Sequence, residues 1–179
     1  MANKHFLGKL ISPVSFILLG ALARIIPHAP NFTPVAAMAL FGGTYLNKKQ
    51  AFILPILIML LSDLFIGFDS LQMRIFIYGS FLITVLIGRF LKRNLTLTNT
   101  ILASFASSIV FFLITNFAVW AFTPLYLKTF DGLVNCFIMA LPFFRNTLLG
   151  DFFYTGIVFG SYRLTNSWYY KVRLAVIKK

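Results

Sequence analysis

The sequence contains no glutamate, and its only acidic residues are four aspartates, set against 16 lysines and arginines. Only 11% of its 179 residues are charged, whereas 59% are hydrophobic. Because soluble domains are about 45–50% apolar, this composition excludes an ordinary soluble fold. The net charge of +12 would suit nucleic-acid binding, but the basic residues lie in short segments between apolar runs and near both ends of the chain. That distribution is typical of a membrane protein, so we predict no nucleic-acid partner.

Cysteine is equally scarce. Cys136 is the single cysteine of the chain, which excludes an internal disulfide and a metal site built from several cysteines. The phosphate-binding pattern GxxxxGK[ST] is absent, as are HExxH, GxSxG and CxxC. A hydrolase could be assembled in principle from His28 with Asp63 or Asp151, but no pattern marks a nucleophile. We therefore predict neither an enzyme nor a cofactor or metal site.

What the sequence does contain is a series of long apolar runs. They predict an all-α integral membrane protein of one domain with six transmembrane helices, at residues 10–27, 31–47, 51–67, 74–91, 99–122 and 143–161. The apolar run 132–141 is too short to cross and is expected to be a re-entrant or interfacial piece. The first span has an alternative interpretation as a cleavable signal peptide, because a basic start precedes it and small residues lie near its end. Cleavage would leave the later topology unchanged.

The second span is expected to be unusually short. Thr33-Pro34 marks a helix start, which leaves about 13 helical residues before Asn47, fewer than the roughly 17 that a crossing needs. Residues 31–33 are then extended near membrane depth, where backbone is tolerated only inside protein or beside a cavity. Ala39 and Gly43 form a small-xxx-small pair that favours a close approach between helices.

The positive-inside rule orients the six spans. With the amino terminus in the cytoplasm, the outer segments hold only Arg74 and Lys128 among the basic residues, together with Asp69 and Asp131. The inner segments hold Lys4, Lys9, Lys48, Lys49, Lys92, Arg93, Lys171, Arg173, Lys178 and Lys179, with Arg89 and Arg163 at their edges. We therefore predict a multi-pass protein of the bacterial inner membrane with both termini in the cytoplasm.

Four ionisable side chains lie within the apolar segments, where a lone charge costs roughly 3 kcal/mol and persists only if it pairs or lines a wet cavity. They are Arg24, Asp63, Arg145 and Asp151. In the predicted topology all four fall in the outer half of the bilayer. The same half receives the polar residues Asn31, Asn116, Trp120 and Asn146. We therefore predict an outward-opening pocket with these eight residues as its substrate-binding candidates.

The charges of this pocket are expected to balance. Arg145 and Asp151 lie six positions apart, about 240° around an ideal helix, so they cannot pair with each other. Each then needs a partner on another span, and Arg24 and Asp63 are available. A pocket of mixed charge suits a zwitterionic or hydrogen-bonding ligand better than a simple cation.

These residues also have structural interpretations. Arg24 lies near a helix end, from which its guanidinium can snorkel to the interface. Trp120 is typical of an interfacial aromatic belt. Asp63 and Asp151 are deeper, and a charge network around them could serve only to hold the helices together. Span 99–122 carries a polar stripe that is expected to face other helices. The stripe consists of Ser104, Ser107, Ser108 and Thr115.

A family resemblance is carried by four segments: RIIPHAPNFTPVAAMALFGG, LPILIMLLSDLFIGF, SSIVFFLITNFAVW and LPFFRNTLLGDFFYTGIVFG. Together they resemble a family of small bacterial membrane proteins regarded as transport proteins, over residues 20–161. That family is similar at the level of fold to the substrate-binding S components of energy-coupling-factor (ECF) vitamin transporters. The resemblance implies an S-component-like bundle with a site near the outer face. It also implies a partner transmembrane subunit and a pair of ATPases.

The sequence departs from the S components in the surface through which they dock to their partner subunit. S components often dock through an Ala-xxx-Ala surface on the first helix, a spacing that the first span here lacks. The nearest small-xxx-small pair is Ala39 and Gly43 on the second span. Docking to an energising module is therefore in question, and no substrate-contacting residue can be carried over.

The function predicted from the sequence is binding and uptake of a small polar molecule, such as a vitamin or its precursor. One alternative is a solitary proton-coupled carrier, since two buried aspartates near arginine can relay protons. Another alternative is a structural or assembly protein of the membrane with no ligand.

Overall fold

In a computed structural model, the described part of the chain comprises residues 13–177, with side chains described for residues 15–169. This part folds into six helices, which confirms the all-helical prediction. In chain order they are α2 (Pro13–Ile25), α3 (Val35–Tyr45), α4 (Lys48–Ile66), α5 (Leu71–Leu91), α6 (Leu97–Phe122) and α7 (Phe130–Ile177). The start of the predicted span 10–27 and the basic residues Lys4 and Lys9 lie outside the described residues.

Four of the helices, α4 to α7, are long and apolar enough to cross a membrane. The other two are shorter, with 13 residues in α2 and 11 in α3. At 1.5 Å per residue, 11 residues cover only about 17 Å of a hydrocarbon core that is about 30 Å thick. The predicted span 31–47 is thus a short helix preceded by the non-helical segment 26–34, as the Thr33-Pro34 signal indicated.

The outside of the helix bundle is rich in exposed apolar side chains. Among them are Leu19, Leu64, Phe65, Ile75, Phe90, Leu102 and Leu113, each at least half exposed. Soluble monomers rarely expose large contiguous apolar patches, whereas lipid chains are their natural neighbours. Together with the four long helices, this surface indicates a membrane protein.

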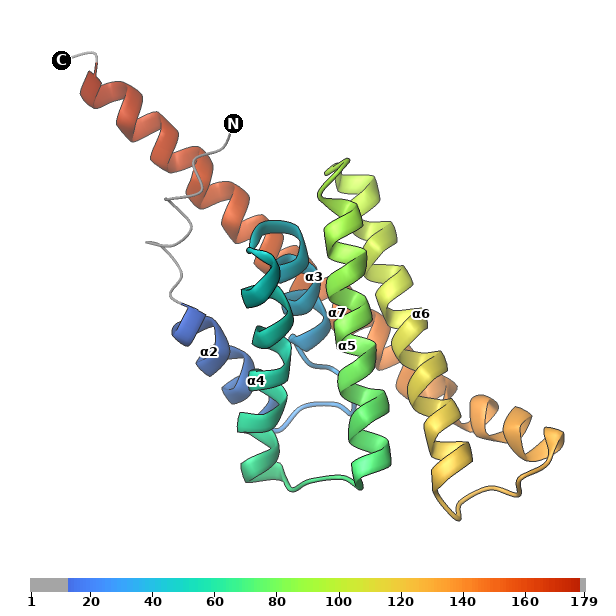
Figure 1. Cartoon of the computed structure of the whole chain (residues 1–179). Coiled ribbons are helices and arrows are strands. Elements are labelled where there is room, and N and C mark those ends of the chain that lie inside the picture. Colours follow the sequence, from blue (N-terminus) through green and yellow to red (C-terminus); the bar gives the residue numbers. More distant parts are fainter. Residues whose placement is uncertain (1–12, 178–179) are drawn as a thin grey trace.

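The helices alternate in direction along the chain (Figure 1). The loops between α3 and α4 and between α5 and α6 lie at one end, the upper one in this view, to which the last turns of α7 also point. Lys48, Lys49, Lys92 and Arg93 belong to that end. The opposite end carries the loops 67–70 and 123–129, whose charged residues are Asp69 and Lys128. The separation of charge expected from the positive-inside rule is therefore a separation between the two ends of the folded chain.

The last helix differs from the prediction. The piece 132–141, the span 143–161 and the segment after it belong to one helix of 48 residues that passes through Pro142. Proline has no backbone N–H and clashes with the preceding turn, so it bends a helix without necessarily ending it. Figure 1 shows α7 changing direction within its orange portion. The proline therefore changes the course of the helix where the sequence suggested two elements.

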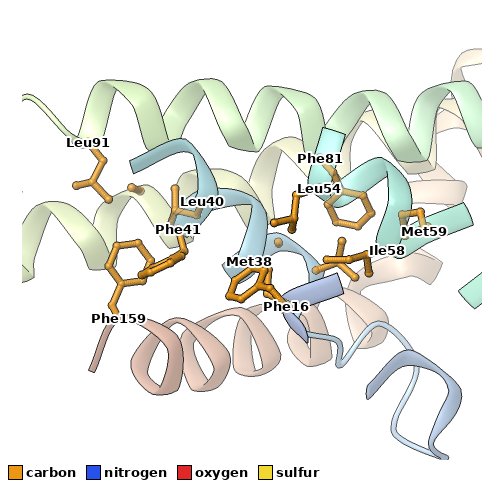
Figure 2. Close-up of a cluster of buried hydrophobic side chains, with 13 residues drawn as sticks. Phe16, Met38, Leu40, Phe41, Leu54, Ile58, Met59, Phe81, Leu91 and Phe159 are labelled. Carbon is orange, nitrogen blue, oxygen red and sulfur yellow. The ribbon is translucent and has the colours of Figure 1, made fainter. Parts of the chain in front are cut away.

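Helix α3 forms the centre of the bundle, because every residue from Val35 to Thr44 is buried. Its close approach to α5 depends on glycine: a Cβ on Gly43 would lie 2.2 Å from the carbonyl oxygen of Val85. The small pair Ala39 and Gly43 therefore serves internal packing, as expected for a close helix approach. Figure 2 shows the surrounding apolar cluster, in which the Phe41 ring meets the edge of Phe159 of α7 at 5.3 Å between centroids.

Candidate functional site

A pocket of about 280 Å³ lies between the helices toward the end that carries the 67–70 loop. All six helices, the 26–34 segment and the 67–70 loop contribute residues to its wall. The lining residues are Arg24, His28, Asn31, Thr33, Ala36, Met59, Asp63, Ile66, Asp69, Ile77, Tyr78, Phe81, Phe111, Thr147 and Asp151. The pocket thus lies on the side where the sequence placed the intramembrane polar groups, and we call it the polar pocket.

One wall of the polar pocket contains an ion pair between Arg24 and Asp63. Arg24 Nη1, in the last turn of α2, donates to Asp63 Oδ1 of α4 at 2.6 Å. The second carboxylate oxygen accepts a hydrogen bond from the hydroxyl of Tyr78 on α5 at 2.5 Å. Arg24 also donates to the hydroxyl of Ser62. Both oxygens of Asp63 are therefore occupied, and its charge is compensated by Arg24, as the sequence allowed.

This pair is well shielded from water. The side chain of Asp63 is 7% exposed and that of Arg24 is 17% exposed. Such shielding strengthens the attraction between the charges but also makes either charge costly if its partner is lost. Together with Tyr78, the pair links three helices, because Arg24 belongs to α2, Asp63 to α4 and Tyr78 to α5.

Helix α7 contributes a second buried carboxylate to the pocket wall, and this carboxylate has no cationic partner among the described residues. Asp151 of α7 is 3% exposed, and its Oδ2 accepts a hydrogen bond from the hydroxyl of Ser108 on α6 at 2.6 Å. Ser108 belongs to the polar stripe of α6, whose four members are all buried, which confirms that the stripe faces other helices. One helical turn further, Ser104 and Thr155 approach each other to 3.2 Å.

The 26–34 segment is held against α7 beside Asp151. A Cβ on Gly150 would lie 3.1 Å from the Cα of Phe32, so glycine at this position permits the contact. The Phe32 ring packs on Phe153 and Tyr154, with centroids 5.7 and 5.5 Å apart. Asn31 adopts a φ of 63°, a left-handed conformation that asparagine tolerates better than most residues. This turn sets residues 31 and 33 into the wall of the pocket.

A second cavity of about 310 Å³ adjoins the polar pocket. The two share Asn31, Ile77, Phe111 and Thr147 as wall residues. Its remaining walls are mostly apolar and aromatic: Phe112, Thr115, Asn116, Val119, Leu125, Tyr126, Cys136, Met139, Ala140, Phe143 and Phe144. We call it the aromatic cavity. The predicted residue Asn116 lies here and donates to the carbonyl oxygen of Phe112 at 2.8 Å.

Three of the eight predicted residues line neither cavity. Arg145 is exposed, and no described carboxylate lies within ion-pair distance of it. Asn146 is partly buried but outside both linings. Trp120 donates its indole N–H to the carbonyl oxygen of Leu127 at 2.9 Å, near the loop 123–129. The expectation of two arginines meeting two aspartates is therefore corrected, because Arg145 is exposed, lines neither cavity and forms no ion pair with Asp151.

The sequence pattern of one protein family matches residues 4–173, which is most of the chain. The chain belongs to this family, DUF6580, a family of unknown function. No curated protein and no solved structure matches the chain. The family assignment names no substrate, and it makes no connection to the S components of ECF transporters.

Sequence reasoning missed Tyr78, which completes the Asp63 site. A signal was present, because a tyrosine within an apolar span needs a partner for its hydroxyl, and Tyr78 lies on such a span. His28 is exposed but lines the polar pocket, and its Nε2 lies 3.2 Å from the carbonyl oxygen of Arg24. Among the described residues, no three His, Cys, Asp or Glu side chains lie close enough to hold a metal.

Proposed function

We propose that this protein binds a small molecule in the polar pocket and takes part in its uptake across a bacterial inner membrane, with the pocket facing outward. The observation that carries the proposal is the combination of two buried aspartates, Asp63 and Asp151, with an open cavity between helices of membrane-spanning length. Ionisable groups at such depth usually mark a ligand or ion pathway, because an unused charge there is costly. Cavities of roughly 300 Å³ and above suit small organic ligands.

The test is native mass spectrometry of the gently purified chain. A bound small molecule is expected to co-purify with the unmodified protein and to be lost from Asp151→Asn. Asp131→Asn serves as the control, because Asp131 lies at the start of α7 outside both cavities. Bare protein that also fails to respond to a panel of vitamins and their precursors would contradict the proposal and favour a structural role.

A finer form of the proposal is a substrate-capture subunit that works with an ECF-type transmembrane subunit and ATPases. The alternating helices and the pocket at one end are compatible with such a role. The small pair Ala39 and Gly43 is buried against α5, so a docking surface must lie elsewhere. Cross-linking in native membranes tests the partnership: capture of a transmembrane subunit together with ATPases supports it, and capture of the chain alone contradicts it.

A second candidate, a proton-coupled carrier, is favoured by Asp151, which no cationic side chain among the described residues compensates. A proton is the smallest cation that can neutralise such a carboxylate. This candidate predicts that Asp151→Asn still binds the ligand but no longer accumulates it in vesicles with an imposed pH gradient. Loss of binding itself would argue against proton coupling through Asp151.

A further inference from the structure

The polar pocket concentrates negative charge in a strongly basic protein. Three of the four aspartates of the chain line it: Asp63, Asp69 and Asp151. Of the 16 lysines and arginines, Arg24 is the only one that the described residues bring to its wall. The lysines, arginines and aspartates that line the pocket therefore carry a net negative formal charge, opposite in sign to the net charge of +12.

The single arginine of the wall, Arg24, already forms an ion pair within the protein. Arg24 is bonded to Asp63, whose second oxygen is bonded to Tyr78, so this wall presents a neutral pair to a ligand. Asp69 lies exposed in the loop between α4 and α5, at the edge of the pocket. There it adds attraction for an approaching cation without fixing its position.

Asp151 is the group that remains uncompensated. Ser108 donates to its Oδ2, and no described residue donates to its Oδ1. Among the described side chains, only one polar atom, Arg74 Nε, is both fully buried and without a hydrogen-bond partner. Asp151 Oδ1 also has no partner, so it is not fully buried and retains some accessible surface. Asp151 lines the polar pocket, and this pocket is the cavity available to that oxygen. A buried carboxylate with an unused oxygen beside a cavity is complementary to a positively charged N–H donor.

The adjoining aromatic cavity indicates what such a donor is attached to. Its walls include Phe111, Phe112, Phe143 and Phe144, and it joins the polar pocket at shared wall residues that include Phe111 and Thr147. An apolar or ring-shaped body fits these walls, because aromatic side chains make up much of them. A simple inorganic cation would leave the aromatic cavity empty, and an anionic group would be repelled by the carboxylate of Asp151.

The geometry points to a small organic cation as the ligand class: a protonated amine placed at Asp151 Oδ1, joined to an apolar ring that occupies the aromatic cavity. This inference rests on the proposed binding function and specifies its substrate. It replaces the zwitterion expected from a balanced set of charges, because Arg145 does not reach the pocket.

The test compares three probes that share a phenyl ring and a short chain but differ in charge: 2-phenylethylammonium, 2-phenylethanol and phenylacetate. Binding is measured by saturation-transfer NMR on the full chain in nanodiscs of zwitterionic lipid, with empty nanodiscs subtracted. The ammonium probe is expected to bind at least tenfold more tightly than the alcohol and the carboxylate. Asp151→Asn is expected to remove this preference, and Asp131→Asn is expected to keep it. The comparison on the unmodified chain stays decisive even if Asp151→Asn fails to fold.

The outcomes separate the inference from the proposed function. Tighter binding of the alcohol or the carboxylate, or a co-purified compound without a positive charge, overturns the inference and leaves small-molecule binding intact. Equal binding of the ammonium probe by the unmodified chain and by folded Asp151→Asn also overturns it. If no probe binds and no compound co-purifies, both the inference and the proposed function fall.

Discussion

Two aspartates of similar burial are in opposite electrostatic states in this fold. Asp63 has a guanidinium and a phenol hydroxyl on its two oxygens, whereas Asp151 has one serine hydroxyl. Removing a buried carboxylate therefore has opposite consequences at the two positions. Replacing Asp63 leaves the charge of Arg24 without a partner, whereas replacing Asp151 removes a buried charge that had no cationic partner.

We expect Asp63→Asn to lower the free energy of unfolding by about 2–4 kcal/mol, because Arg24 would keep its charge in a site that is only 17% exposed. Thermal unfolding in detergent measures the change. The double variant Arg24→Met with Asp63→Asn is expected to recover part of the loss, since no unpaired charge remains. A single variant as stable as the unmodified chain would show that the pair contributes little to folding.

We expect Asp151→Asn to raise the free energy of unfolding of the ligand-free protein by about 1 kcal/mol, because an amide is cheaper to bury than an uncompensated carboxylate. The same unfolding measurement on ligand-free protein checks the sign, with Asp131→Asn as the unchanged reference. Destabilisation at position 151 would indicate a compensating group, which would remove the basis for a ligand cation there.

At the scale of the helices, α3 and α5 pack very closely beside the polar pocket. α3 directly follows the 26–34 segment, and α5 carries Tyr78. The two axes approach closely because Gly43 and Gly88 have no side chains between them: their Cα atoms are near enough that a Cβ on Gly43 would lie 3.1 Å from the Cα of Gly88. Thr44 adds a hydrogen bond to the carbonyl oxygen of Gly88 at 3.1 Å.

Gly43→Ala is expected to destabilise the fold by more than about 2 kcal/mol, because its Cβ would lie 2.2 Å from the backbone oxygen of Val85 and must push the helices apart. Gly79→Ala is the matched control on α5, where a Cβ meets nothing within 4 Å. Alanine is there expected to be neutral or to stabilise by up to about 1 kcal/mol through helix propensity. Unfolding in detergent compares the two, and equal effects would contradict the close packing.

At the scale of the whole molecule, the two ends differ in charge and in polarity. Basic residues gather at the end with the α3–α4 and α5–α6 loops, and the polar pocket opens toward the other end. Under the positive-inside rule, this arrangement predicts a pocket on the outer side of the membrane, which is the orientation that the proposed uptake requires.

A reporter fused after residue 179 is therefore expected to report a cytoplasmic location, and one inserted in the loop 123–129 an external location. Paired enzyme reporters, one active only inside and one only outside the cytoplasm, make the measurement in intact cells. The opposite result at both positions would place the pocket inward and would contradict uptake by capture from outside.

The sequence alone determined the class of fold and the side on which its polar groups gather. Apolar runs predict membrane helices and the basic residues between them predict an orientation, because transfer of charge into lipid is costly whatever the neighbouring structure. The same logic singled out Arg24, Asn31, Asp63 and Asp151, which do line one pocket. It also indicated the helix start at Thr33-Pro34 and the buried stripe of α6.

Only the tertiary structure decided how the charges are paired. Whether Arg145 faces a pocket or the exterior depends on the rotation of α7, which packing against α6 and the bend at Pro142 set together. The partners of Asp63 and Asp151 come from residues 15 to 43 positions away, and no local pattern specifies such contacts. Helical periodicity tells which residues share a face, but the rotation of one helix against its neighbours depends on side-chain fit across the whole bundle.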